Sequence, residues 1–204
     1  MFFKQILANG DNFSYIVADE NLGVAAVVDP SFNAAEIGRE LEAKNLRLKY
    51  IVNTHGHPDH TEGNAELNEK FGGRIVVHSK SETRADLRVD DGDVLEVGRV
   101  RMKVIYTPGH SVDSMCLLVD GKRLLTGDTL FVGECGRTDM PGGSPRSMYD
   151  SLFNKILKLE DTVEVYPGHD YGPKQFSTLG EERRSNYTLQ PRSVDEFIRF
   201  MSQP

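Results

Sequence analysis

The chain has 204 residues, which is long enough for one substantial core and short for two independent domains, so we expect a single domain over residues 1–204. Its net charge is −7 and no cluster of lysine or arginine interrupts the acidic balance, which argues against a nucleic-acid partner. No apolar run approaches the roughly 18 residues of a membrane span. With no signal peptide and just two cysteines, we predict a cytoplasmic protein that needs no disulfides and no membrane partner.

Strands and helices alternate in the first half of the chain. The run from Val24 to Asp29 is predicted as a buried strand, and Pro30 ends it because proline cannot donate to a sheet. Asn33 then resembles the cap of a helix that continues to about Lys44. We expect further strands over residues 14–18, 48–52 and 75–78, and a second helix from about Glu62 to Phe71.

Two hairpins dominate the second half. The first joins residues 94–97 to 100–106 through Gly98-Arg99, and the second joins residues 115–119 to 123–126 through Asp120-Gly121. Strands in two groups with helices between them imply an α/β fold in which two mixed sheets pack between helical layers, an αββα sandwich. A helix over Met148–Leu157, a strand over residues 163–166 and two short helices are predicted to complete the chain.

The chemistry is concentrated in the histidines, five of which follow the ends of predicted strands. The segment His55-Gly56-His57-Pro58-Asp59-His60 places four potential metal ligands within six residues. Its glycine and proline favour a loop over a helix, so that the side chains can converge. Three further ligands each follow a later strand: His110, Asp128 and His169.

Neutral imidazoles and carboxylates together suit zinc, iron or manganese, and the lack of cysteine in this set disfavours a structural zinc-thiolate site. A single histidine is usually a surface or core residue, which is how we interpret His78. A dense cluster followed by three more strand-end ligands is much harder to obtain by chance. The sequence therefore predicts one metal centre that contains all seven side chains.

These residues resemble the metallo-β-lactamase superfamily, and the resemblance, which rests on the segment from Thr54 to His60 and the three later ligands, covers nearly the whole chain. It implies an αββα fold with metal ions at one edge. A carboxylate can bridge two cations because it has two oxygens, and a water between them loses a proton near neutral pH and becomes a nucleophile. Asp59 and Asp128 are therefore the catalytic candidates. The resemblance implies that one metal ion is held by His55, His57 and His110, a second by Asp59, His60 and His169, and that Asp128 bridges them.

Two families within the superfamily, both acting on thiol derivatives, match further residues. The stretch from Asp128 to Arg137 is similar to glyoxalase II, the hydroxyacylglutathione hydrolase, although the chain ends before the basic helical region of that family. The stretches Cys135–Asp139 and Tyr166–Tyr171 resemble the persulfide dioxygenases more closely. In that family one iron is held by the positions matching His55, His110 and Asp128. Met140-Pro141 departs from the Phe-Gln that the dioxygenases have there.

Our preferred hypothesis is a metallo-hydrolase that cleaves a thioester, such as a hydroxyacylglutathione, by a hydroxide on two divalent metal ions (Zn, or Fe/Mn), because the second ligand set is complete. The alternative is a glutathione persulfide dioxygenase with one Fe(II), and the families behind both hypotheses retain all seven ligands. A third hypothesis is a metal-binding scaffold without catalysis. The expected partner is a small-molecule thiol derivative, and the sequence leaves monomer and dimer open.

Five other residues receive smaller predictions. Arg137 is a candidate for binding a substrate carboxylate, and an ion pair with Asp139 is the competing interpretation. Tyr171 either faces the site and binds substrate or covers the sheet. Asp29 is expected to hydrogen-bond a ligand histidine. Cys135 is interpreted as a structural or surface thiol, and Lys80 as a surface residue.

Overall fold

The computed structural model describes residues 1–8 and 10–202. Within this part of the chain, the strands form two six-stranded sheets, each built from one half of the sequence. The first sheet has the order β1-β2-β3-β4-β5-β6, with antiparallel pairs up to β3 and parallel pairs beyond it. Its strands are β1 (Phe2–Leu7), β2 (Phe13–Asp19), β3 (Val24–Val28), β4 (Arg47–Val52), β5 (Arg74–His78) and β6 (Leu87–Val89).

The second sheet has the order β12-β11-β10-β9-β8-β7, and its neighbours are antiparallel except for β10 and β11. The two predicted hairpins are confirmed, with the turns at Gly98 and at Asp120-Gly121 held by positive φ angles. Its strands are β7 (Val94–Val97), β8 (Val100–Tyr106), β9 (Met115–Val119), β10 (Arg123–Gly127), β11 (Glu164–Pro167) and β12 (Ser177–Thr178).

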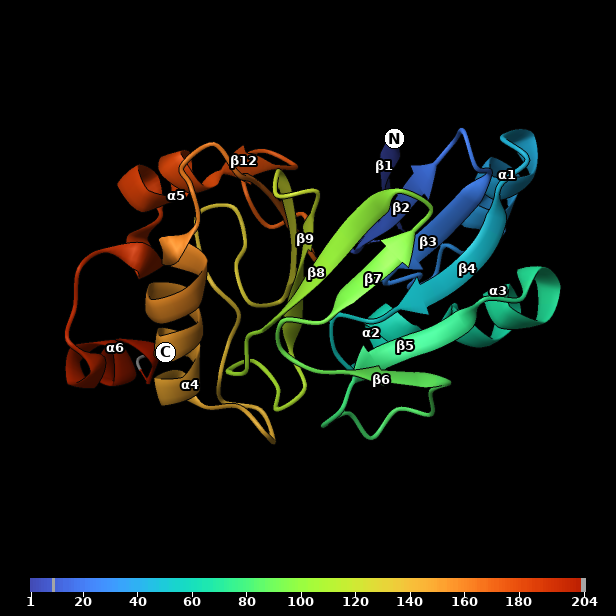
Figure 1. Ribbon diagram of the computed structural model, residues 1–204. Helices are drawn as coiled ribbons and strands as arrows, with labels where there is room; N and C mark the ends of the chain where they lie inside the picture. The colour runs from blue at the N-terminus through green and yellow to red at the C-terminus, as the bar shows by residue number, and fades with distance from the viewer. Residues whose placement is uncertain (9, 203–204) are drawn as a thin grey trace.

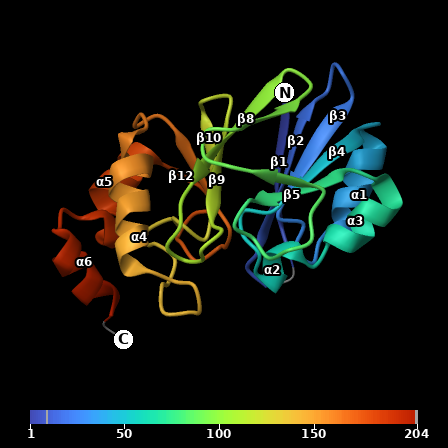
Figure 2. The same ribbon diagram turned by 60° about the horizontal axis from the view of Figure 1, so that its bottom comes forward.

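The sheets pack face to face, and helices cover the outer face of each (Figures 1 and 2). α1 (Ala34–Ala43) and α3 (Asn64–Phe71) lie on the first sheet; α4 (Pro145–Tyr149) and α5 (Leu179–Ser185) lie on the second, and α6 (Val194–Met201) packs against α4. Three apolar clusters follow from these layers, one between the sheets and one under each helical layer. The predicted αββα sandwich is confirmed. Among the described residues, no helix is both long and apolar enough to cross a membrane.

Several local expectations were incomplete or wrong. The strands β1, β6 and β12 were not predicted; β6 and β12 are too short to show a period. The segment expected as a loop contains the one-turn helix α2 (Pro58–Thr61), because Pro58 occupies the first helical position, where its missing N–H costs nothing. Asn33 is at the N-cap of α1, but its side chain makes no capping hydrogen bond.

The helix expected over Met148–Leu157 begins earlier, at Pro145 of α4. The side chain of Ser144 caps it by accepting the N–H of Ser147 at 3.2 Å. Beyond Tyr149 the chain continues as a π-helical segment, Asp150–Lys155, and a 3₁₀ turn, Ile156–Lys158.

Candidate metal centre

The structure brings all seven predicted ligands together at one edge of the two sheets. Their side chains form three overlapping groups, and the potential ligand atoms within each group lie within 4.8 Å of one another. Strands β4, β8, β10 and β11 all lead towards this edge, so residues from position 55 to position 169 meet there. The groups are His55, His57 and His110; His55, His60 and Asp128; and Asp59, His60 and His169.

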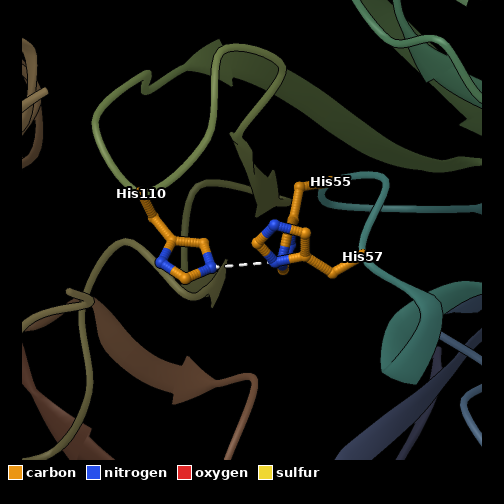
Figure 3. A group of neighbouring side chains, drawn as sticks. All are labelled: His55, His57 and His110. Carbon is orange, nitrogen blue, oxygen red and sulfur yellow. Dashed lines mark hydrogen bonds between the residues drawn. The ribbon is translucent and has the colours of Figure 1, made fainter. Parts of the chain in front are cut away.

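The first group consists of three imidazoles that point at one another (Figure 3). His57 Nδ1 lies 2.9 Å from His55 Nε2 and 3.0 Å from His110 Nε2. Burial and the neighbouring His60 hold the pKa of His55 well below its usual value, and burial and His110 lower the pKa of His57. Both rings are therefore neutral at physiological pH, which is the form that binds a metal ion.

Apart from His57, each histidine ligand is oriented by a hydrogen bond at Nδ1, the ring nitrogen that points away from the site. His55 Nδ1 meets the hydroxyl of Thr54 at 3.2 Å, and His110 Nδ1 meets the carbonyl oxygen of Arg137 at 2.9 Å. His169 Nδ1 meets Asp11 Oδ1 at 3.0 Å. This arrangement fixes the tautomer and directs Nε2 into the site, as is usual around protein-bound metals.

Asp29 organises the first half of the site, as predicted. It lies at the end of β3 with a φ of 47° and is 1% exposed. Its carboxylate accepts the N–H and the hydroxyl of Thr54 at 2.8 and 2.7 Å, and its Oδ2 lies 3.0 Å from His60 Nδ1. One buried carboxylate thus holds the loop before His55 and the ring of His60 together.

Asp128 lies between the two outer groups. Its Oδ1 is 3.3 Å from His60 Nε2, while its Oδ2 is 3.5 Å from His110 Nε2 and 3.4 Å from His169 Nε2. Gly168 makes this approach possible, because a Cβ there would lie 2.4 Å from Asp128 Oδ1. The two carboxylate oxygens therefore face different members of the ligand set, which is the geometry that a bridging ligand needs.

The group of Asp59, His60 and His169, which we call the second ligand group, favours positive charge. Although burial lowers the pKa of His60, the carboxylates of Asp128 and Asp29 raise it well above its usual value. Asp59 Oδ2 lies 3.7 Å from His60 Nε2 and 3.5 Å from His169 Nε2. Among the described residues, His60 Nε2 and Asp128 Oδ1 are buried polar atoms without a hydrogen-bond partner. Because such atoms are costly to leave unpaired, the donor set fits a bound cation.

The two predicted substrate residues lie beside the metal ligands. Arg137 forms a bidentate ion pair with Asp139, with both N···O distances 2.7 Å, so the predicted ion pair is present, and substrate binding by Arg137 stays a prediction. Tyr171 stacks on the ring of His169 at 4.8 Å between centroids, and burial raises its pKa to about 12. Both border a cavity of about 520 Å³ that His110 and Asp128 also line.

Three other residues were assigned minor roles. His78 lies outside the ligand set and stacks on Tyr106 at 4.1 Å, with the ammonium of Lys80 4.8 Å from the same ring. Cys135 is buried, which agrees with the structural interpretation and not with the surface one, and it lines the same cavity as Arg137.

Sequence reasoning missed three residues that support the site: Asp11, Thr54 and Glu182. The first two orient ligand histidines, as described above. Glu182, in α5, is 1% exposed and accepts the N–H of Gly133 at 2.9 Å and the hydroxyl of Ser177 at 2.6 Å. In the sequence it is a charged residue directly after Glu181 of the capping box of α5, a place that indicates a surface role.

Comparison with known proteins assigns the fold and site to a class. Residues 8–169 match the model of the metallo-beta-lactamase superfamily, and the chain belongs to this superfamily. Superfamily members bind metal ions, in agreement with the donor set described above.

Its similar relatives divide between two enzyme names. The hydroxyacylglutathione hydrolase of Pelagibacter ubique is 34% identical over 91% of this chain and 79% of that protein. The human mitochondrial persulfide dioxygenase ETHE1 is 35% identical over 93% of this chain and 75% of that protein. The crystal structure of ETHE1 from Myxococcus xanthus superposes with a TM-score of 0.91 at 33% identity, covering 100% of this chain and 92% of that one.

Proposed function

We propose that the protein is a hydrolase that cleaves the thioester of a small thiol, such as a hydroxyacylglutathione, with two divalent metal ions. The observation that carries the proposal is the complete second ligand group: Asp59, His60 and His169 converge within 4.8 Å, and Asp128 faces both groups. Hydrolysis by a hydroxide held on two metal ions requires this second set to be complete.

The position of each residue determines its role in this proposal. The first metal ion would be held by the first group and the second by Asp59, His60 and His169, with Asp128 between them. Bound divalent cations supply Lewis acidity and lower the pKa of water towards neutrality. Asp59 is the member of the second group that reaches solvent, its side chain being 40% exposed, and it accepts the proton from water. The ion pair with Asp139 uses two N–H groups of Arg137 and leaves three to bind a substrate carboxylate.

The alternative function is a persulfide dioxygenase with one Fe(II) held by His55, His110 and Asp128. The observation that favours it is the likeness to the Myxococcus ETHE1 structure, which extends over the whole chain. The two functions differ in their need for Asp59.

The deciding experiment is therefore Asp59→Asn, which keeps the shape of the side chain and removes its charge. For a two-metal hydrolase we expect thioester hydrolysis to fall by orders of magnitude and metal content to drop by about half. Metal content is measured on protein purified anaerobically without added metal, together with thioester hydrolysis and with oxygen consumption on a persulfide. Glu62→Gln, which neutralises an exposed carboxylate at the end of α2, is the matched control and should change none of these values.

Two outcomes contradict the proposal. If oxygen consumption survives in Asp59→Asn and neither protein hydrolyses thioesters, the dioxygenase replaces the hydrolase. If the fully metal-loaded protein turns over neither substrate, the protein is a metal-binding scaffold.

A further inference from the structure

The cavity beside the metal centre has one apolar side, formed where α6 meets the loop after β10. Met201 Sδ lies 3.8 Å from Cys135 Sγ, and the rings of Tyr187 and Phe200 meet edge-on at 5.9 Å between centroids. Burial raises the pKa of the Cys135 thiol to about 12, so this sulfur carries no charge at physiological pH. We call these four residues, which all line the cavity, the acyl pocket: Cys135, Tyr187, Phe200 and Met201.

Charged side chains line the cavity as well. Arg137 and Asp139 form their ion pair there, and Glu134 accepts the hydroxyl of Tyr187 at 3.2 Å. Within the part of the chain that the structure describes, Arg137 is the one cationic side chain that lines the cavity. A substrate carboxylate therefore has a single partner, and the apolar side offers none.

We infer that the acyl pocket binds the acyl group of the thioester and selects an apolar one, either aromatic or a chain of several carbons. The inference rests on the proposed function. A thioester has two branches that meet at its carbonyl carbon, which must lie at the metal ligands His110 and Asp128. The carboxylates of a carrier such as glutathione need Arg137, which leaves the acyl branch for the acyl pocket. A volume of about 520 Å³ is typical of a small-molecule site.

The test is a series of S-acylglutathiones in which the carrier is constant and the acyl group grows from acetyl through butanoyl to hexanoyl. Because each buried methylene contributes about 0.8 kcal/mol, kcat/KM should rise roughly fourfold per methylene. Met201→Glu, which places a charge in the acyl pocket, should remove this increase. Ile198→Ala is the matched control, because Ile198 is an apolar residue of the same helix that does not line the cavity.

A binding measurement separates this inference from the proposed function. S-methylglutathione and S-hexylglutathione are thioethers that cannot be hydrolysed, and calorimetry on the metal-loaded protein should show the hexyl compound binding at least about tenfold more tightly. Equal binding together with a flat acyl series would overturn the acyl pocket and leave hydrolysis standing. Tighter hexyl binding without hydrolysis of any thioester would overturn the hydrolase and leave the pocket standing.

Discussion

The two halves of the chain contribute to the site in different ways. The first half supplies four ligands from six consecutive residues, and one buried carboxylate, Asp29, holds that segment in place. The second half supplies its three ligands one at a time, from the ends of three different strands, and it also supplies every residue that lines the cavity. The potential metal ligands are thus shared between the halves, whereas the cavity belongs to the second. This division can be tested from both sides.

The largest effect is expected at Asp128, which faces both the first and the second ligand group. Asp128→Asn removes the charge of the carboxylate whose two oxygens face His60 and His110. We expect both metal ions to be bound more weakly and thioester hydrolysis to fall by more than about a hundredfold, the upper range seen for residues outside the ligand shell. Metal analysis and steady-state kinetics measure both effects. Full metal content in the variant would show that Asp128 is not a shared ligand.

A smaller loss of metal affinity is expected when Asp29, the carboxylate that holds the ligand segment of the first half, is changed. Asp29→Asn weakens its hydrogen bonds to Thr54 and His60, so metal affinity should fall by roughly 10- to 100-fold without loss of a ligand. The comparison variant is Asp11→Asn, because Asp11 is 49% exposed and contacts only the ring of His169 among the ligands. Competition with a chelator ranks the two affinities, and an effect of Asp11→Asn equal to that of Asp29→Asn would contradict the assigned role.

In the second half, Glu182 should affect substrate binding and not metal binding. Its carboxylate holds the loop that carries Phe131 and Cys135 to the cavity by accepting the N–H of Gly133. Glu182→Gln should raise KM several-fold, lower the melting temperature by roughly 5 °C and leave metal content unchanged. Glu181→Gln alters an exposed neighbour and should leave KM unchanged. A loss of metal in Glu182→Gln would contradict the division between the halves.

The ion pair of Arg137 and Asp139 can be tested with two variants that should change KM in opposite directions. Arg137→Ala should raise KM for an acidic thioester several-fold and lower kcat less, because the lost interaction binds substrate and transition state alike. The pKa of Asp139 is held at about 2 by its hydrogen bond from Arg137, so the pair stays ionised at assay pH. Asp139→Asn frees the guanidinium and should lower KM. If KM changes in neither variant, Arg137 has a structural role only.

The smallest effect is expected on stability at acidic pH, through a contact between the two halves of the chain. The N–H of Arg99, between β7 and β8, donates to Asp19 of β2 at 2.8 Å, and this bond lowers the pKa of Asp19. Because the folded-state pKa is depressed, the stabilisation is complete above the unfolded-state value, about 3.9, and is lost as the pH falls towards the folded one. Asp19→Asn should therefore reduce the loss of stability between about pH 5 and pH 3, measured by urea unfolding. An unchanged slope would remove Asp19 from the acid response.

The fold and the ligand set were accessible from the sequence because both depend on local signals. The apolar run Val24–Val28 indicates a buried strand, and the ligand segments begin within a few residues of strand ends. The cavity beside the ligands could not be predicted from the sequence in this way. The cavity joins Cys135 to Met201 and depends on the contact of Glu182 with Gly133, and pairs so distant in sequence leave no pattern in one chain. The bidentate pair of Arg137 and Asp139 was foreseen only as one of two alternatives, because sequence proximity does not fix a side chain's partner.

The separation of the two sheets along the sequence determines when the metal centre can form. β1 to β6 are complete when residue 89 has been made, yet each group of three ligands includes a residue from position 110 or later. A growing chain can therefore assemble its first sheet without a metal site, and the site appears when the second sheet docks. A metal ion that binds only the docked state stabilises it by about 2.7 kcal/mol at a hundred times its dissociation constant. Metal binding and the docking of the two sheets are therefore expected to be coupled.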